Sequence, residues 1–315
     1  MVLALDPAKP FDRSAVRHHR DRAAPRFDAH GFLFDEVGTR LLDRLADFRR
    51  SFPRVLELGC RNGRLSPQLA AIGNETFIRA DFSEAMARAA KTGHPGPPTL
   101  VADEEILPFA DSSFDLVVSN LALHWVNDLP GALSQIRRML RPDGLLLASL
   151  FGGDTLNELR DSLLAADVAV SDGATPRVSP FCDVRDAAHL LARAGFALPV
   201  ADVDRITVTY PDALALMREL RGMSETSALT LRQRNFTRRA TILNACEHYA
   251  KSFAAAEEPG RITASFEAIY LTAWSPHESQ QKPLQPGTAT ARLADALDSR
   301  EQLTDDPAQP NATKR

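Results

Sequence analysis

The stretch from Val55 to Gly63 reads VLELGCRNG, and it decides the fold because an apolar run leads into a glycine turn and then a helix. This order is typical of the first strand, turn and helix of a nucleotide-binding α/β unit. Gly59 would let the backbone approach a ligand closely, and Gly63 would let the start of the helix pack tightly. For the glycines alone, an ordinary strand-to-helix turn without a ligand remains the alternative.

An acidic residue stands at the end of the next apolar run. Asp81 follows residues 76–80, about 20 residues after the turn, and a carboxylate there can accept hydrogen bonds from both ribose hydroxyls. The turn reads Glu57-x-Gly59-x-x-x-Gly63 and not Gly-x-Gly-x-x-Gly. The spacing therefore favours an adenine nucleoside over a dinucleotide.

Composition and charge are those of an ordinary globular chain. Its 315 residues can bury a full core, in one large domain or two small ones. A formal net charge of −4 gives no reason to expect nucleic acid or an anionic membrane as a partner. No apolar run approaches the length of a membrane span, and the N-terminus lacks the apolar core of a signal peptide.

Three scattered cysteines, Cys60, Cys182 and Cys246, form no CxxC pair. We therefore expect neither a disulfide framework nor a metal site, and a reducing compartment suits the chain. The expected location is the cytoplasm, or the mitochondrial matrix if the source is eukaryotic. The sequence does not predict the oligomeric state.

Strands and helices alternate between residues 53 and 151, which predicts a parallel sheet with right-handed crossovers. We expect strands at 54–58, 76–80, 98–102, 114–119 and 145–151. Patterns at 206–210 and 266–274 predict two more strands. The predicted class is thus α/β, with Thr155 and Glu158 forming a capping box at the helix that follows the fifth strand.

Other segments flank or interrupt this core. Residues 1–50 are predicted to be an N-terminal helical extension, and residues 51–291 the domain that holds the sheet. A helical insert at about 212–258 is long enough to be a lid, and residues 292–315 have the composition of a disordered tail. Apolar residues at helical spacing should face a core: Phe32, Leu33, Val37, Leu41, Leu42 and Leu45.

The basic segment from Arg13 to Arg26 allows two interpretations. It could bind an acidic partner, but short charged runs are more often solvated helix faces, which is the interpretation we prefer. A second cluster of polar residues follows the third and fourth strands. Carboxylates at 103–105 could accept from the exocyclic amine of adenine, or form a solvated acidic turn. Ser119 and Asn120 stand where the fourth strand should end, beside the nucleoside pocket.

With these motifs the sequence resembles the class I S-adenosylmethionine-dependent methyltransferases, in particular the type 11 group. The matching pieces are the glycine turn, Asp81, the block at 102–109 and Phe114-Asp115. The resemblance implies a Rossmann-like, seven-stranded fold and S-adenosyl-L-methionine as cofactor, with the turn at the methionine moiety, Asp81 at the ribose and Asp103 at the adenine. The cofactor site implied in this way comprises Glu57, Gly59, Cys60, Gly63, Asp81, Phe82, Asp103, Glu104 and Asn120.

One position departs from that family. Arg61 stands where the family usually has glycine. If the backbone there needs a positive φ, an arginine is strained, and the affinity for the cofactor or its geometry differs.

A closer resemblance covers roughly residues 9–290. The words LHWVNDLP at 123–130, FGGDTL at 151–156 and HESQ at 277–280 are similar to those of the mitochondrial complex I assembly factors. The resemblance implies hydroxylation of an arginine in the complex I subunit that carries the terminal iron–sulfur cluster. That subunit would be the protein partner, and the chain a bacterial counterpart or a mature mitochondrial form.

Methyl transfer chiefly requires alignment of nucleophile and methyl group, together with removal of a proton. The candidate catalytic residues are His124, Asp154 and His277. His124 could equally be a structural histidine beside an aromatic residue, and Asp154 a polar group at a helix start. His277 and Glu278 are expected near the edge of the sheet that holds the glycine turn only if the last strand runs antiparallel.

Three functions from different classes remain open. The first is an enzyme that modifies a protein side chain during complex assembly, and the second is a small-molecule or carrier-linked O-methyltransferase of the malonyl-thioester type. The third is a non-catalytic assembly chaperone that binds the cofactor for stability. Arg61 in the methionine site would favour the third, a hydrophobic acyl tunnel the second, and carboxylates beside the sulfonium an arginine substrate.

Overall fold

The computed structural model describes residues 9–73, 75–170, 173–233 and 235–281, together with 295 and 297–299. The chain divides into two compact units, Met1–His277 and Glu278–Arg315, and all elements named below lie in the first. The predicted tail at 292–315 lies outside the described residues, apart from 295 and 297–299.

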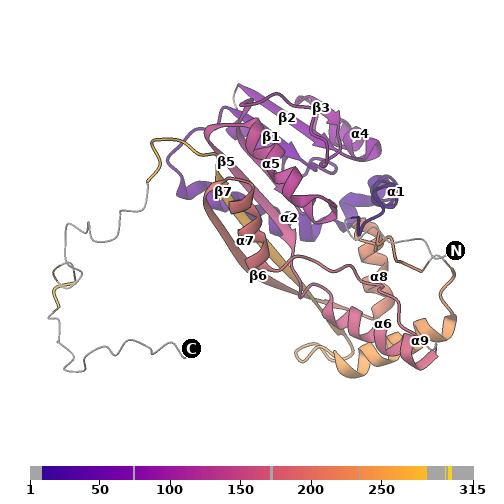
Figure 1. Ribbon diagram of the computed structural model, residues 1–315. Coiled ribbons are helices and arrows are strands. Elements are labelled where there is room, and N and C mark those ends of the chain that lie inside the picture. Colours follow the sequence, from indigo (N-terminus) through magenta and orange to yellow (C-terminus); the bar gives the residue numbers. More distant parts are fainter. Residues whose placement is uncertain are drawn as a thin grey trace, which may run out of the picture. The chain divides into compact units, whose positions relative to one another are not determined.

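Within the described residues, seven strands form one sheet in the order β3-β2-β1-β4-β5-β7-β6 (Figure 1). Strands β1 to β5 are parallel, and β7 runs antiparallel to both β5 and β6. The seven-stranded α/β sheet expected from the sequence is confirmed. Its strands are β1 Arg54–Leu58, β2 Thr76–Asp81, β3 Thr99–Val101, β4 Phe114–Asn120, β5 Leu140–Phe151, β6 Ala197–Tyr210 and β7 Ile262–Trp274.

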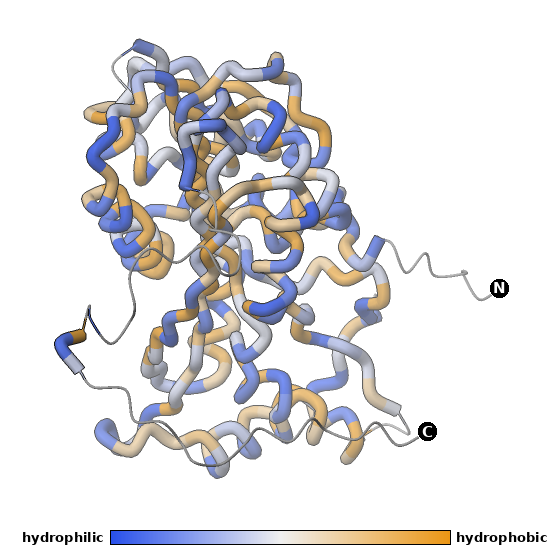
Figure 2. Tube along the Cα trace, turned by 60° about the vertical axis from the view of Figure 1, so that its left-hand side comes forward, coloured by the Kyte–Doolittle hydropathy of each residue, from blue (hydrophilic) through white to orange (hydrophobic). Residues whose placement is uncertain are grey.

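Helices cover both faces of this sheet. Side chains along β4 and β5 alternate between two apolar clusters, as expected for a sheet buried on both sides. In Figure 2, hydrophobic stretches of the chain run through the middle of the tube, while many hydrophilic stretches lie at its outside. One cluster includes α5 (Leu129–Met139) and α7 (Val184–Arg193). The other includes α2 (Phe32–Asp43), α3 (Ser66–Ile72) and α4 (Glu84–Gly93).

The N-terminal segment is helical. It forms α1 (Arg13–Ala23), the 3₁₀ turn η1 (Ala24–His30), α2 and the turn η2 (Arg44–Asp47). Asp12 caps α1 by accepting a hydrogen bond from the backbone N–H of Ala15. Of the residues expected in a core, Leu33, Val37 and Leu41 are fully buried, and Leu42 and Leu45 pack at its margin. The expectation for Phe32 is wrong, because its side chain begins α2 on the outer face and is 42% exposed.

Three helices pack beyond the end of β5: α6 (Asn157–Val170), α8 (Ala213–Gly222) and α9 (Arg239–Ser252). The predicted capping box does not form. The Thr155 hydroxyl donates to the carbonyl of Glu267, and the Glu158 carboxylate accepts from the N–H and hydroxyl of Ser265. Both side chains therefore attach the start of α6 to β7, because that strand offers backbone groups beside them.

Candidate cofactor and substrate site

The glycine turn follows β1 and has the backbone that the sequence predicted. Gly59 has φ +72, and a Cβ there would lie 2.2 Å from the Cβ of Ala122. Gly63 has φ +81, and its Cβ would lie 3.0 Å from Ser66 Oγ. Both positions therefore need glycine for conformation, and Gly59 also for close approach to the segment after β4.

Asp81 fixes this turn to the end of β2. Its fully buried carboxylate accepts from the backbone N–H of Arg61 at 2.9 Å and from the backbone N–H of Ser83 at 2.8 Å. It also lies 3.4 Å from Nη1 of Arg20. Backbone N–H groups and a guanidinium thus already bind the carboxylate that the sequence assigned to a ribose.

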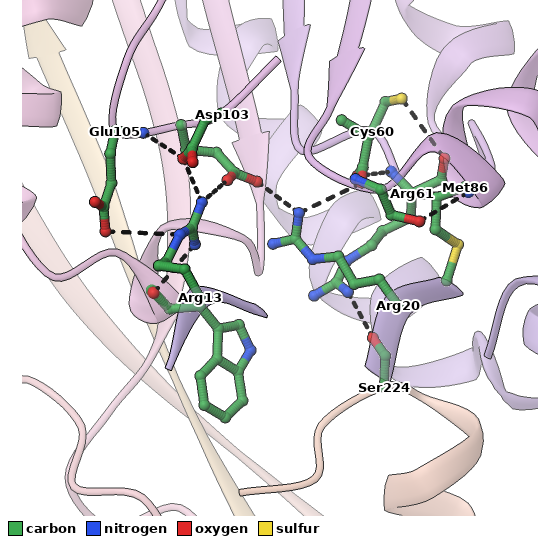
Figure 3. A network of polar contacts seen from close by, with 12 residues as sticks. Arg13, Arg20, Cys60, Arg61, Met86, Asp103, Glu105 and Ser224 are labelled. Carbon is green, nitrogen blue, oxygen red and sulfur yellow. Dashed lines mark hydrogen bonds and ion pairs between the residues drawn. The ribbon is translucent and has the colours of Figure 1, made fainter. Parts of the chain in front are cut away.

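The acids after β3 are bound in the same way. Glu104 is fully buried and lies 2.6 Å from Nη1 of Arg20 and 2.6 Å from Nη2 of Arg13. Burial alone would raise the pKa of the Glu104 carboxyl, but the two arginines hold that pKa at about 2. Asp103 lies 2.5 Å from the same Nη2 of Arg13, and its side chain is partly exposed (Figure 3).

Helix α1 supplies these arginines, so its basic segment is not simply a solvated face. Arg20 is fully buried, whereas Arg17 and His18 are exposed. The guanidinium groups of Arg13 and Arg17 lie 4.1 and 4.2 Å from the ring centroid of Phe82. The preferred expectation was wrong for Arg13 and Arg20, because acids of the chain itself bind them.

Arg61 has φ 52, which confirms the strained backbone expected for this position. Its Nη1 donates to Ser224 Oγ at 2.5 Å, and its Nη2 donates to the carbonyl of Leu121 at 3.1 Å. The same Nη2 lies 2.8 Å from Oε1 of Glu225, and the guanidinium carbon 5.2 Å from the ring centroid of Phe34. Arg61 is therefore buried, and its contact with Ser224 is drawn in Figure 3.

Little free space remains at the glycine turn beside Arg61. The cavity there measures about 20 Å³ and is lined by Gly59, Arg61 and Asn120, among others. We call this region, together with Asp81 and Glu104, the glycine-turn crevice. A ligand as large as an adenosyl group enters it only when Arg20 and Arg61 move.

The other predicted cofactor residues also have internal partners. Glu57 accepts from the Ser66 hydroxyl at 2.8 Å, and burial raises the pKa of its carboxyl to about 8. Burial likewise raises the pKa of the Cys60 thiol well above its ordinary value. Asn120 donates to the carbonyl of Phe34 at 2.8 Å and accepts from the Ser149 hydroxyl at 2.8 Å.

His124 lies next to this crevice, in the 3₁₀ turn η3 (Leu123–Trp125). Its Nε2 is 3.1 Å from Oε2 of Glu225, which also accepts from the indole N–H of Trp125 at 2.9 Å. Burial lowers the pKa of His124 despite the nearby carboxylate. Within the described structure its buried Nδ1 has no hydrogen-bond partner. A neutral ring donating through Nε2 leaves Nδ1 as a proton acceptor.

The structure does not bring the other two catalytic candidates to this place. Asp154 is exposed and pairs with Arg205. Because β7 is antiparallel to β5, its end at Trp274 pairs with Leu145 near the start of β5. His277 therefore follows β7 at the edge opposite to the glycine turn. From the sequence, we expected an antiparallel last strand to bring His277 to the glycine-turn edge. This expectation was wrong, because the antiparallel pairing of β7 places His277 at the opposite edge.

Two residues of the site were missed by the sequence analysis. Ser224 and Glu225 come directly after α8, in the segment predicted as a helical insert. Their contact with Arg61 joins positions more than 160 residues apart, and no local motif marks it. The only sequence signal for them is the run of polar residues that follows the end of α8.

A larger cavity of about 310 Å³ lies among α6, α8, α9 and the segment at 177–181, and Trp125 and Glu225 also line it. We call it the large cavity. Its walls are mostly apolar, and they include Leu156, Leu159, Leu163, Phe181, Met217 and Leu220. Among the described residues, buried atoms on its wall lack partners: Arg22 Nε and Nη2, and the hydroxyls of Ser179, Thr226 and Ser227. This lining suits an apolar group with an anionic or accepting end.

Grouped metal-ligating side chains and membrane-spanning helices are both absent from the described residues. In that part of the chain no three His, Cys, Asp or Glu side chains are grouped so that they could hold a metal ion. No helix in the same ranges has the length and apolar character needed to cross a membrane.

Comparisons with known proteins identify the fold and the relatives. Residues 56–148 match the family model described as a methyltransferase domain. The human protein "Arginine-hydroxylase NDUFAF5, mitochondrial" is 41% identical over 288 residues, which are 90% of this chain and 82% of that protein. A malonyl-[acyl-carrier protein] O-methyltransferase of Methylovorus sp. is 36% identical over 276 residues, 84% of this chain and 90% of that protein.

A solved structure shows the same fold. A putative methyltransferase from Bacillus halodurans superposes with a TM-score of 0.52 at 19% identity. The match covers 76% of this chain and 98% of that one. The seven-stranded sheet and its order are thus those of the class I methyltransferase fold.

Proposed function

Because the chain belongs to the NDUFAF5 arginine-hydroxylase family of methyltransferase-fold enzymes, we propose that it modifies an arginine of a protein partner. We propose as partner the iron–sulfur subunit of respiratory complex I, modified during assembly in the cytoplasm or the mitochondrial matrix. The observation that carries the proposal is a guanidinium buried at the carboxyl edge of the sheet. Glu225, Ser224 and the Leu121 carbonyl bind it beside His124.

S-adenosyl-L-methionine is the proposed cofactor, and the residues present fit its polar groups. Once Arg20 and Arg61 have moved, Asp81 would accept from the ribose hydroxyls and Asp103 from the adenine amine. Buried donors without partners in the described structure, Arg20 Nε and Nη2 and Arg61 Nε, would donate to a carboxylate. When bound, this cofactor supplies an electrophilic methyl group on a sulfonium.

The chain's own side chains would orient the acceptor and remove a proton. Glu225 holds a guanidinium through Oε1, while its Oε2 fixes His124 and Trp125. A neutral His124 would accept at Nδ1 the proton that leaves the substrate nitrogen, and burial keeps the ring in its neutral form because it lowers the pKa of His124. Rings of Trp125, Phe151 and Phe181 surround His124 and limit access of water.

Intact-mass analysis tests the function. The purified chain is incubated with S-adenosyl-L-methionine, or with a reductant and dioxygen, and with the iron–sulfur subunit. A subunit lacking the candidate arginine serves as control. We expect the mass of one methylene or one oxygen to be gained only by the subunit that retains the arginine. An unchanged mass while the cofactor binds would instead support a non-catalytic assembly protein, which the buried position of Arg61 favours.

A second candidate function is favoured by the large cavity. Its apolar walls and the unpartnered Arg22 suit the carboxylate end of an acyl chain. We propose as alternative a carrier-linked O-methyltransferase acting on a malonyl thioester. The same mass analysis with a malonyl thioester on acyl carrier protein distinguishes the two, because an esterified carboxylate gains one methylene and an arginine peptide gains nothing.

A further inference from the structure

The group that binds Arg61 has the chemistry of a guanidinium receptor. Two hydrogen bonds come from different nitrogens, Nη1 to Ser224 Oγ and Nη2 to the Leu121 carbonyl, and Glu225 adds a charge-assisted bond. The ring of Phe34 lies 5.2 Å from the guanidinium carbon. Several acceptors directed at a planar cation, with an aromatic ring nearby, favour guanidinium over the compact ammonium of lysine.

Backbone strain is concentrated at this receptor. Leu121 has φ 47 and Ser224 has φ 65, and the residue that they bind, Arg61, has φ 52. Each is a non-glycine residue in the left-handed region, where such residues are uncommon. Strain of this kind gathers at ligand-binding sites, where the surrounding structure holds it in place. The turn after α8 and the turn after β4 are therefore shaped to present their acceptors to one point.

Glu225 is fixed before any outside group arrives. Its Oε2 accepts from the Trp125 indole at 2.9 Å and lies 3.1 Å from Nε2 of His124. Burial would raise the pKa of the Glu225 carboxyl, but His124 and Arg61 lower it, so the group stays ionised. Its Oε1 is then directed at the cation, and preorganisation of this kind strengthens binding.

Arg61 occupies the receptor imperfectly. Its Nε is buried and has no partner among the residues that the structure describes. Burial and the nearby Arg20 cation lower the pKa of Arg61 to about 10. A guanidinium carried on another backbone could satisfy the same acceptors without the strain at position 61. Glu225 also lines the large cavity, so the receptor borders a space that a side chain can enter.

We infer that Glu225, Ser224 and the Leu121 carbonyl form the binding site for the substrate arginine of the protein partner, and that Arg61 occupies this site in cis until the partner's arginine displaces it. The inference rests on the proposed function and adds to it the position of the substrate and a form of autoinhibition. No bond is made or broken in the exchange, because one guanidinium replaces another.

Binding of a small guanidinium to a variant without the resident arginine tests the inference. Glycine adopts φ 52 without strain, so Arg61→Gly opens the receptor and keeps the turn. In calorimetry we expect ethylguanidinium to bind Arg61→Gly about tenfold more tightly than ethylammonium does. Wild type should bind neither. Arg64→Gly is the matched control, because Arg64 pairs with Asp28 and Asp35 and its loss leaves the receptor occupied.

A second substitution identifies the acceptor. Adding Glu225→Gln to Arg61→Gly should weaken ethylguanidinium binding by about tenfold or more, since a charge-assisted bond becomes a neutral one. Equal binding of the two cations, or binding that Glu225→Gln leaves unchanged, would overturn the inference. Should Arg61→Gly fail to fold, Arg61→Asn provides the same test, because asparagine tolerates the left-handed region.

The iron–sulfur subunit separates failure of the receptor from failure of the proposed function. If ethylguanidinium binds as expected but the subunit gains no mass, the receptor stands and the function is wrong. If the subunit is modified and Glu225→Gln leaves its KM unchanged, the function stands and the receptor is wrong. We expect Glu225→Gln to raise that KM by about tenfold, and Arg61→Gly to lower it.

Discussion

The glycine-turn crevice and the large cavity meet at Glu225 but differ in what fills them. The crevice has about 20 Å³ of free space beside the buried Arg61 side chain, whereas the large cavity has about 310 Å³ behind mostly apolar walls. A ligand enters the cavity by displacing solvent. A ligand that binds in the crevice must first displace the arginine side chains that already form ion pairs with Asp81, Glu104 and Glu225. The glycine-turn crevice is thus held closed by charge, whereas the large cavity is preformed.

This difference predicts how cofactor affinity is controlled. When only a small fraction of the protein is in the conformation that binds a ligand, the apparent affinity falls in proportion to that fraction. The closed state here depends on how strongly Arg20 and Arg61 are held. Substitutions in the crevice should therefore have larger effects on stability than substitutions in the cavity.

Glu104→Gln should produce the largest effect. It removes the charge that pairs with Arg13 and Arg20 and leaves the fully buried Arg20 poorly compensated. We expect the free energy of unfolding in urea to fall by about 3–5 kcal/mol. Glu84→Gln is the control, because Glu84 and Arg88 form an exposed pair whose loss should cost about 0.5 kcal/mol or less. Equal losses in the two variants would show that charge does not hold the crevice closed.

The pH dependence of Glu57 gives the next effect. Burial raises the pKa of its carboxyl from 4.5 to about 8, so the folded state retains a proton that the unfolded state releases above pH 4.5. This contribution to stability is fully present below pH 4.5 and is lost as the pH rises to about 8. From pH 5 to pH 8, wild type should lose about 3–4 kcal/mol relative to Glu57→Gln, which cannot ionise. Parallel stability curves for the two proteins would contradict the raised pKa.

In the large cavity, Arg22→Met should change binding more than stability. The Nε and Nη2 atoms of Arg22 have no partners in the described structure, so the substitution should alter the free energy of unfolding by less than about 0.5 kcal/mol. Decanoate, an apolar chain with one carboxylate, should bind about tenfold more weakly by calorimetry. Arg26→Met removes the same charge from an exposed position and should leave decanoate binding unchanged. If both variants bind alike, the carboxylate does not reach Arg22.

The smallest expected effect is a difference in stability between alanine variants of two serines, Ser119 and Ser149, near the ends of the neighbouring strands β4 and β5. Ser149 donates to Asn120 and accepts from the backbone N–H of Leu121, so Ser149→Ala should cost about 1 kcal/mol. Ser119 is equally buried, but its hydroxyl has no partner in the described ranges, and Ser119→Ala should be nearly neutral. Thermal unfolding of the two variants provides the measurement. A larger loss for Ser119→Ala would mean that its hydroxyl bonds to a group outside these contacts.

The fold was predictable because its signals are local. Apolar runs with glycine between them indicated β1, β2 and β4, whereas strain at Arg61 was predicted only on the condition that its backbone has a positive φ. The expected role of Asp81 as a cofactor ligand stays a prediction. Strand direction at β7 was not encoded locally, which is why the position of His277 was misjudged.

The charges in the site could not be derived in the same way. Arg20 and Glu104 are 84 residues apart, and Arg61 and Glu225 are 164 apart. A run of basic residues in α1 looks the same whether water or a buried carboxylate neutralises it. Only the packing of α1 against the sheet edge distinguishes the two cases.

The order of the chain adds a consequence for biosynthesis. Arg13 and Arg20 leave the ribosome well before Glu104, which follows them by 91 and 84 residues. Until the third strand has been made, helix α1 lacks the acids that receive it, and its cations remain in water. Docking of helix α1 is therefore a late event in the maturation of the nascent polypeptide, although this helix is synthesised before the strands that receive it.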